Sequence, residues 1–480
     1  MKKVWILIPA LLCLGTLMLT SCQKQTAAGV PTLIWYLNGP APPPADLGEN
    51  ARIMSDYTQE KIGVRFEIRN ITIDGGREAV AAALESGAPF DIISSQASNY
   101  AEAVPQGVFA GLAAALPVHA PALWDFVPPY LWDAVTVQGE IYAVPAYKDS
   151  SGTLFAFIDE RYVRKYNIDP AKNTLADFER AFYAMKAGEG PDFFPIIIDV
   201  SPASPFPLNL VEYDNLGIGV GFGDMIGVRI GDENRRVVSV FEEPEMRERF
   251  RTFRRWYQDG IISPVNPGAA QIIRGMPVVY DFAWPSKAQV LEAQREVERY
   301  IAIPLNTPVI TTGMIRGSLL CLSANSKHQA EALKLIELIN TDHKFRDMLA
   351  YGIEGKHFEY VSYNVVHRLS DAYPAYEWAQ GTFFNLSTTD NQPPDTWEEV
   401  RKQNEAAIPS VVLGFSMDIS GLRSEFEGCL PIYARYAEEI KIGAVDPDEA
   451  IPRFMAELRA AGFGRIIAEA QRQVNAAYPK

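Results

Sequence analysis

The N-terminal segment places a single cysteine where a thiol can be acylated. Lys2 and Lys3 precede an apolar run, residues 4–19, that is shorter than the roughly 20 residues needed to span a bilayer. The run leads into Leu19-Thr20-Ser21-Cys22, which resembles the bacterial lipobox, where a signal peptide is cut before a lipidated cysteine. We therefore expect residues 1–21 to be a lipoprotein signal peptide, Cys22 to carry lipid, and residues 22–31 to be a tether. A signal peptide with an incidental cysteine is the alternative.

The residue arrangements of common covalent catalysis are missing from the sequence. No H-E-x-x-H, G-x-S-x-G, Walker A or C-x-x-C sequence occurs. The five histidines are scattered, so we expect no metal site, and the glycines between 217 and 227 do not form G-x-G-x-x-G. Carboxylates number 59, but their order marks no pair as acid and base. The sequence therefore favours a protein that is not an enzyme and needs no cofactor.

The composition is that of an acidic globular protein large enough for two domains. Of its 480 residues, 48% are hydrophobic and 21% charged. The net charge of −15 becomes about −17 without residues 1–21, and no basic patch is interleaved with aromatics, so nucleic acid is not an expected partner. An exported compartment permits a disulfide between Cys321 and Cys429, but the apolar surroundings of Cys321 favour a buried free thiol.

The first hundred residues alternate between strand and helix patterns. Three apolar or alternating runs predict strands: residues 32–37, 64–69 and 90–95. Two helical patterns lie between them and end at Gly63 and Gly87. This β-α-β-α-β order predicts an α/β fold with a parallel sheet covered by helices on both faces. Ligands bind beyond the carboxyl ends of such strands, here near residues 36–38 and 94–96.

The rest of the chain is predicted to continue the mixture of strands and helices. Residues 137–145 are expected to form a tight turn at Gly139 and then a short strand that Pro145 ends. Strands are also expected at 153–159 and 276–284, and helices at 159–167, 174–187, 244–260 and 341–351. Ser326 and Gln329 have the spacing of a capping box, before a helix that buries Leu333, Ile336 and Ile339. The tail predicts two helices broken at residues 462–464.

Four segments resemble bacterial extracellular solute-binding proteins of the maltose-binding type. Residues 136–145, TVQGEIYAVP, are similar to the family's G-x-I-Y-A-V-P segment. Residues 333–361, 413–418 and 443–473 resemble the LplA-like subgroup of sugar-binding lipoproteins, with its characteristic C-terminal region. The family often has W-x-x-G-N-x-F where this chain reads WAQGTFF, residues 378–384, with Thr382 in place of the asparagine. If that loop touches ligand, the specificity differs here.

The resemblance implies a two-lobed α/β fold of the periplasmic-binding-protein type II, with an interlobe cleft and a hinge. The expected lobes are residues 32–148 plus 302–345 for lobe 1, and 149–301 plus 346–480 for lobe 2. Hinge crossings are expected at 143–153, near 301–303 and after the helices of 326–350. In the family the lobes close on the ligand and the closed form docks on an ABC permease.

A carbohydrate ligand needs aromatic rings for the C–H face of the sugar and planar polar groups for its hydroxyls. The aromatic candidates, at strand ends and in the resembling loop, are Trp35, Tyr36, Trp284, Trp378 and Phe383. The polar candidates are Asn38, Ser95, Gln96, Lys148, Asp149, Asp281 and Asn385. Neighbouring strand residues point to opposite faces, so Trp35 and Tyr36 are not expected to reach the ligand together. For each candidate, packing in the core or forming a turn is the competing interpretation.

The sequence thus predicts a monomeric, lipid-anchored substrate-binding protein of an ABC importer. It would capture a carbohydrate, an oligosaccharide by expectation, outside the cytoplasmic membrane, and binding to both lobes would favour closure. Two alternatives stay open: a secreted lipoprotein that hydrolyses polysaccharide, and a peptide or small-polyanion receptor of the same fold. The acidic net charge disfavours anions.

Overall fold

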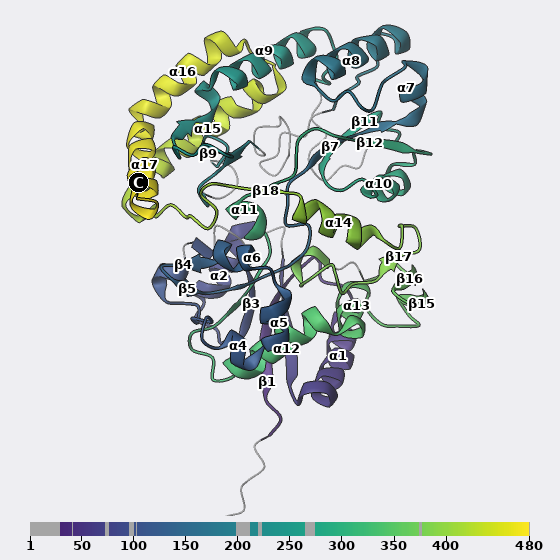
Figure 1. The fold of residues 1–480 in the computed structure, drawn as a ribbon, viewed down its shortest axis with the longest axis vertical. Helices are drawn as coiled ribbons and strands as arrows, with labels where there is room; N and C mark the ends of the chain where they lie inside the picture. Colours follow the sequence, from purple (N-terminus) through teal and green to yellow (C-terminus); the bar gives the residue numbers. More distant parts are fainter. Residues whose placement is uncertain are drawn as a thin grey trace, which may run out of the picture.

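The chain folds into two α/β halves, one above the other in Figure 1. The computed structural model describes residues 29–479 apart from 41, 73–75, 96–99, 102, 198–211, 219–222, 265–273 and 374–376. The expected signal peptide, Cys22, most of the tether and the candidate Gln96 lie outside the described residues. We call the lower half of Figure 1 lobe 1 and the upper half lobe 2. The two-lobed α/β architecture predicted above is confirmed.

Lobe 1 is built on a mostly parallel five-stranded sheet. Its elements are β1 (Thr32–Gly39), α1 (Leu47–Ile62), β2 (Arg65–Thr72), α2 (Gly76–Glu85), β3 (Ile92–Ser95), η2 (Val104–Gln106), α4 (Leu116–His119), α5 (Pro121–Phe126), α6 (Pro129–Ala134), β4 (Thr136–Val137), β5 (Glu140–Ile141), β6 (Val144–Pro145), α11 (Thr312–Ile315), β14 (Leu319–Leu322), α12 (Gln329–Thr341) and α13 (His343–Tyr351). The strand order is β2-β1-β3-β14-β6, with β1 parallel to β2 and β3. Gly63 ends α1 in the left-handed conformation, at φ 69°. The predicted β-α-β-α-β unit is confirmed.

Lobe 2 is built on a three-stranded antiparallel sheet, β11-β7-β12, with a second small sheet and long helices around it. Its elements are β7 (Leu154–Asp159), α7 (Glu160–Lys165), α8 (Leu175–Glu189), β8 (Tyr213–Asp214), β9 (Ile226–Arg229), β10 (Val237–Ser239), η3 (Val240–Glu242), α9 (Pro244–Gln258), β11 (Val278–Phe282), α10 (Lys287–Arg295), β12 (Tyr300–Pro304), η5 (Ser420–Leu422), α15 (Arg423–Ile442), α16 (Pro447–Ala460) and α17 (Phe463–Ala477). The break between α16 and α17 falls at the predicted glycines.

A smaller group of elements lies between the two lobes or beside lobe 1 (Figure 1). It comprises β13 (Val309–Ile310), β15 (Phe358–Ser362), β16 (Val365–Arg368), η4 (Glu377–Ala379), β17 (Thr388–Thr389), α14 (Thr396–Glu405) and β18 (Ile408–Pro409). β13 and β18 pair in parallel at the junction of the lobes.

Each lobe has its own hydrophobic core. In lobe 1, Leu333, Ile336 and Ile339 are buried, as their spacing on α12 predicted. Cys321 lies in this core and Cys429 in the core of lobe 2, both as buried free thiols. The question of a disulfide is thereby answered, because the two thiols belong to different cores.

The start of α12 differs from the predicted capping box. The helix begins at Gln329, and the side chain of its N-cap residue, His328, makes no capping hydrogen bond. The hydroxyl of Ser326 donates to Asp91 and accepts the N–H of His328 at 3.0 Å, so it is not available to the N–H of Gln329. A tertiary partner 235 residues away in the sequence has replaced the local one.

Residues 346–480 were expected to belong to lobe 2, but the first part of this segment lies outside it. Helix α13 packs on lobe 1, where Phe345, Met348 and Leu349 join the core. Residues further along, including Phe383 and Val400, form a separate small cluster with Trp284. Only from Val412 onward do the buried apolar residues belong to lobe 2.

Candidate binding site at the hinge

Three chain segments run side by side where the lobes meet. The N–H of Gly152 donates to the carbonyl of Val309 at 2.7 Å, and the N–H of Ile408 donates to the carbonyl of Pro308 at 2.9 Å. The first crossing lies within the predicted 143–153. The second lies at 305–310, beyond the predicted 301–303, because those residues belong to β12 inside lobe 2. The third, near 406–410, follows α14. This arrangement is a three-stranded hinge.

Two asparagine side chains hold the first crossing in place. Asn404, on α14, accepts the N–H of Ser151 at 3.0 Å and donates to the carbonyl of Lys148 at 2.6 Å. Asn306 accepts the N–H of Leu154 at 2.8 Å and donates to the carbonyl of Gly152 at 3.1 Å. The two amides therefore accept the backbone N–H groups of Ser151 and Leu154, and each adds a donor to a carbonyl of the crossing. Neither residue was predicted, because each partner lies far along the chain.

Four predicted polar and aromatic residues come together beside this hinge. Lys148 Nζ lies 2.5 Å from Asp149 Oδ1 and 5.9 Å from the ring centre of Phe383. Asp281, at the end of β11, comes from lobe 2. Burial raises the pKa of its carboxyl, and the Asp149 carboxylate raises it further, while Lys287 opposes both. The hinge thus gathers two carboxylates and a lysine from both lobes.

An aromatic cluster adjoins these charges. The ring of Trp284 lies 6.3 Å from Phe383 and 5.9 Å from Trp397, and the last two rings are 4.6 Å apart. Trp284, which follows β11 in lobe 2, is only 5% exposed. Its Nε1 and the Nδ2 of Asn385 are buried without a hydrogen-bond partner among the described residues. These are unsatisfied donors of the kind that a ligand or an ordered water satisfies.

The candidates on the lobe 1 sheet are buried. Trp35 is 0% exposed and packs edge-on against Phe66, so the structure places it in the core and not at a cleft surface. The reason is that β1 is an inner strand of the sheet. Tyr36 stacks on Phe90 at 6.0 Å and accepts from Arg69 at 3.2 Å.

Three further candidates have intermediate or buried positions. Asn38 and Ser95 are buried at the carboxyl ends of β1 and β3. Trp378 is half-buried beside the aromatic cluster.

The side chain of Thr382 is bonded within the protein. It is fully buried, its hydroxyl donates to the carbonyl of Tyr147 at 2.7 Å, and the same oxygen accepts the N–H of Phe384 at 3.0 Å. The departure from the family's asparagine therefore affects how the loop carrying Phe383 is fixed to the first crossing.

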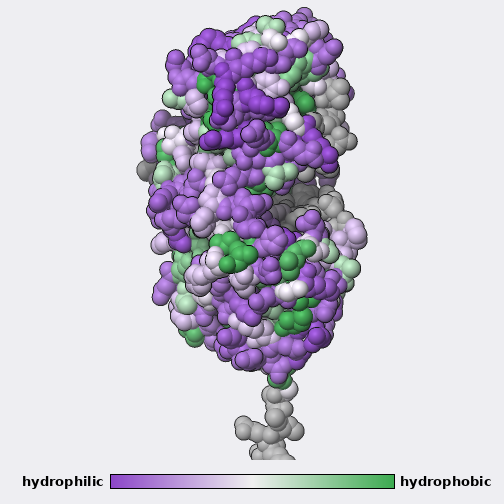
Figure 2. All heavy atoms as spheres, turned by 90° about the vertical axis from the view of Figure 1, so that its right-hand side faces the viewer, coloured by the Kyte–Doolittle hydropathy of each residue, from purple (hydrophilic) through white to green (hydrophobic). Residues whose placement is uncertain are grey.

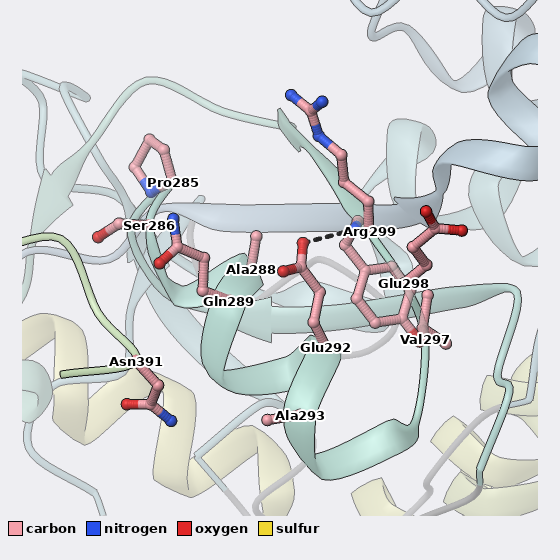
Figure 3. A pocket seen from close by; sticks show the side chains of 11 residues that line it. Pro285, Ser286, Ala288, Gln289, Glu292, Ala293, Val297, Glu298, Arg299 and Asn391 are labelled. Atoms are coloured by element: carbon pink, nitrogen blue, oxygen red, sulfur yellow. Dashed lines mark hydrogen bonds between the residues drawn. The ribbon is translucent and has the colours of Figure 1, made fainter. Parts of the chain in front are cut away.

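Two open hollows flank the hinge on the side of α10 and α14. One, of about 740 Å³, is lined by hinge residues of 304–308 and by Glu399, Lys402 and Gln403 of α14. The other, of about 610 Å³, shares Pro285 with it and is drawn in Figure 3. In this hollow the side chains of Gln289 and Glu292 project from α10, and Asn391 lies on a separate segment. Glu292 accepts the N–H of Tyr300 at 2.8 Å. Figure 2 shows that this side of the molecule is mostly hydrophilic, with its larger apolar patches over lobe 1.

Among the described ranges, no three His, Cys, Asp or Glu side chains lie close enough to hold a metal ion. Over the same part of the chain, no helix combines the length and apolar character needed to cross a bilayer.

Comparison with known proteins gives the family of this two-lobed, hinged chain. The family described as bacterial extracellular solute-binding protein matches residues 52–353, and a domain of unknown function, DUF3502, matches residues 411–479. The chain is a bacterial extracellular solute-binding protein. The family membership expected from the sequence is confirmed.

This solute-binding protein is similar to proteins of Streptococcus pneumoniae and Bifidobacterium longum infantis. A carbohydrate ABC transporter substrate-binding protein of Streptococcus pneumoniae serotype 4 is 24% identical over 96% of this chain and 93% of its own. The N-glycan transport solute-binding protein NgtS from Streptococcus pneumoniae has a TM-score of 0.80 at 22% identity, over 92% of this chain and 98% of that one. A solute-binding protein from Bifidobacterium longum infantis, described as binding HMO, scores 0.65 at 18% identity, over 94% and 100% of the two chains. The structural likenesses show the shared fold.

NgtS is also known in complex with two glycans. The complex with Man1GlcNAc has a TM-score of 0.72 to this solute-binding protein, over 93% of this chain and 99% of that one, and the complex with Man5GlcNAc a TM-score of 0.69, over 92% and 97%. Both are 22% identical to this chain. This structure therefore superposes best, among the three, on the NgtS structure for which no glycan is named.

Proposed function

We propose that this solute-binding protein is the receptor of an ABC importer and that it captures a neutral oligosaccharide between its lobes. The observation that carries the proposal is the relative named as a carbohydrate ABC transporter substrate-binding protein, which aligns with 96% of the chain. The fold shared with NgtS, a glycan-transport protein with solved glycan complexes, supports it.

The chemistry beside the hinge suits such a ligand. Sugars bind through aromatic faces and through hydroxyl contacts with planar polar groups. Trp284 and Phe383 supply rings, Asp149 and Asp281 supply carboxylate acceptors, and the buried N–H groups of Trp284 and Asn385 supply donors. Because Trp284 is buried in this arrangement, stacking on its ring requires the aromatic cluster to separate. Of the twelve candidates, we propose Lys148, Asp149, Asp281, Trp284, Phe383 and Asn385 as the ligand-contacting group.

Binding would act by a shift between two lobe arrangements. A ligand that contacts both lobes in only one arrangement stabilises that arrangement by its differential affinity. The lower TM-scores of the two NgtS glycan complexes are consistent with a different lobe arrangement in the presence of glycan. The three-stranded hinge supports this motion, because short crossing segments can absorb a rotation.

The proposal includes attachment to the outer face of the cytoplasmic membrane through Cys22. The lipobox-like quartet that ends at Cys22 supports this, and two or more acyl chains make a lasting anchor. In a bacterial host given a labelled fatty acid, the wild-type chain should take up the label, whereas Cys22→Ser should take up none, because it has no thiol at that position to be acylated. A wild-type chain that takes up no label would refute the anchor and leave the binding proposal standing.

The binding proposal is tested with the purified mature chain and a panel of oligosaccharides. The panel contains mannose-rich N-glycans, milk oligosaccharides and fructo-oligosaccharides, with a peptide mixture as the comparison. We expect at least one oligosaccharide to raise the melting temperature without forming products detectable by chromatography. At a ligand concentration of 100 Kd the stabilisation is about 2.7 kcal/mol. Product formation would favour the hydrolase alternative, and stabilisation by peptides alone would favour the peptide receptor.

A further inference from the structure

The chain passes between the two cores at the start of the C-terminal domain of unknown function. Residues 411–417, which we call the interlobe strap, begin this domain. Val412, Phe415 and Met417 are buried in the core of lobe 2, whereas Leu413 packs on the core of lobe 1. The strap thus contacts both cores within a few residues, directly after the third hinge crossing.

A buried arginine of lobe 1 holds the strap. Arg316 is fully buried, and its Nε donates to the carbonyl of Ala134 in α6 at 2.7 Å. Its Nη2 donates to the carbonyl of Gly414 at 3.0 Å, and its Nη1 donates to the hydroxyl of Ser416. Burial lowers the pKa of Arg316 to about 10. One guanidinium therefore joins lobe 1 to two residues of the strap.

The strap also packs closely against a backbone carbonyl in the last turn of α6. Gly414 has a φ of 86°, and a side chain there would place its Cβ 2.7 Å from the carbonyl oxygen of Asp133. Its N–H donates to the hydroxyl of Thr312 at 2.9 Å. Only glycine satisfies both the backbone conformation and the space.

Lobe 2 and the end of the C-terminal domain hold the strap from the other side. The N–H of Met417 donates to the carbonyl of Leu216 at 2.9 Å. The hydroxyl of Tyr478, just after α17, donates to the carbonyl of Leu413 at 3.2 Å, and Arg235 Nε donates to the carbonyl of Val411 at 3.0 Å. The buried Asp214 of β8 accepts the N–H of Thr312 at 3.2 Å, which adds a direct bond between lobe 2 and α11.

We propose that the C-terminal domain acts as an interlobe brace: through the strap it holds the two lobes in the arrangement seen here. The contacts of the strap must rearrange when the lobes move. The free energy of these contacts is therefore subtracted from the binding free energy of a ligand that requires the other lobe arrangement. The affinity consequence rests on the proposed function above, whereas the bracing itself does not.

The direction of the effect follows from the comparison with NgtS. The NgtS structure with no named glycan has a higher TM-score to this chain than the two glycan complexes, and on that ground the proposal assigns the arrangement seen here to the ligand-free state. A brace that holds this arrangement then opposes glycan binding. An observed Kd is the intrinsic Kd divided by the fraction of molecules in the binding-competent arrangement. Weakening the brace raises that fraction, and glycan binding becomes tighter.

The test measures the distance between the lobes in the full mature chain. Spin labels are attached at Val118→Cys on α4 and Arg453→Cys on α16, both exposed, in a chain that also carries Cys22→Ser, while the native Cys321 and Cys429 are buried. The weakened brace is the double variant Ser416→Ala with Tyr478→Phe, which removes two hydroxyls and no ring. The matched control is Ser424→Ala in the same domain, whose hydroxyl bonds to the adjacent Glu425.

Without ligand, the double variant should show a broadened or displaced distance distribution, and the control should match the parent chain. For a glycan that binds the parent chain, the Kd of the double variant should be lower than that of the parent by about threefold or more. Unchanged distances in both the double variant and Arg316→Met would overturn the brace, as would weaker glycan binding with altered distances. The distance measurement needs no ligand, so it decides on the brace even if no glycan binds and the proposed function fails.

Discussion

At the scale of single residues, Thr382 shows how one hydroxyl can order a loop beside the hinge. It donates to the carbonyl of Tyr147 and accepts the N–H of Phe384, the residue that follows Phe383 in the sequence. The N–H of Phe383 also donates to Tyr147, at 3.2 Å. The loop and the first crossing are therefore fixed to each other, and with them Phe383 to Lys148.

Removing this hydroxyl should destabilise the protein. Thr382→Val keeps the shape of the side chain but leaves a buried N–H without an acceptor, which costs about 1–3 kcal/mol of unfolding free energy. Urea unfolding measures the change, and Thr382→Ser, which keeps the hydroxyl, should recover most of it. If Thr382→Val unfolded at the same urea concentration as the parent chain, the hydroxyl would not have this role.

Asp281 should make stability depend on pH. Burial raises the pKa of its carboxyl in the folded protein, so the folded state binds the proton more tightly than the unfolded state. Its contribution to stability therefore decreases as the pH rises from the ordinary carboxyl range, about 4, through the raised pKa. Asp281→Asn removes that loss, because the amide does not ionise.

The expected result is a difference in melting temperature that changes with pH. In the absence of ligand, Asp281→Asn should melt higher than the parent chain at pH 7, and the two should converge as the pH falls toward 4. Melting curves at several pH values between 4 and 8 measure this. A difference that stayed constant across the range would show that ionisation of Asp281 is not its cause.

At the scale of elements, α14 is the helix that ties the first crossing to the rest of the hinge. Asn404 bonds to Lys148 and Ser151, and Gln403 donates to the carbonyl of Ala283 at 2.9 Å. The N–H of Ser286 donates to Glu399 at 3.0 Å. One helix therefore contacts the hinge and the lobe 2 segment that carries Trp284.

Loss of the Asn404 amide should loosen the first crossing. Asn404→Leu leaves the N–H of Ser151 without its acceptor, at a cost of about 1–3 kcal/mol. The carbonyl of Lys148 loses one of its donors and keeps the N–H of Ser150. Hydrogen exchange of peptides that cover residues 148–154 should become faster, because opening of the segment requires less free energy. The control is Lys402→Ala, whose side chain is exposed on the same helix. Equal exchange in Asn404→Leu and the control would contradict the role of Asn404.

Elements that depend on local signals could be predicted from the sequence. The strands of 32–37, 64–69 and 90–95 follow from alternation and from glycine stops, and their parallel pairing was confirmed. The capping box at Ser326 failed because Asp91 takes the serine hydroxyl. Asn306 and Asn404 carry no local signal, since the backbone groups to which their side chains bond lie far away in the sequence and come close only in the fold.

Part of the candidate site could also be predicted from the sequence. Lys148, Asp149, Asp281, Trp284 and Phe383 stand at strand ends or in a resembling loop, and the fold gathers them near the hinge. Trp35 also ends an apolar run, but an inner strand buries its ring in the core. Strand position alone does not tell which face of a strand meets a helix and which meets ligand.

At the scale of the whole molecule, two cores, three crossings and one strap define how the lobes can move. The crossings are short and hydrogen-bonded to one another, so each lobe is expected to move as a rigid body. The ligand's contacts with both lobes would favour one arrangement, and the strap would favour the other. The function of the protein then depends on the balance between them.

Small-angle X-ray scattering of the mature chain, with and without a saturating oligosaccharide from the binding panel, tests this central claim most directly. The account predicts a smaller radius of gyration with the oligosaccharide bound, and no change with a sugar that does not raise the melting temperature. An oligosaccharide that binds tightly while the radius of gyration and the scattering profile stay the same would contradict it.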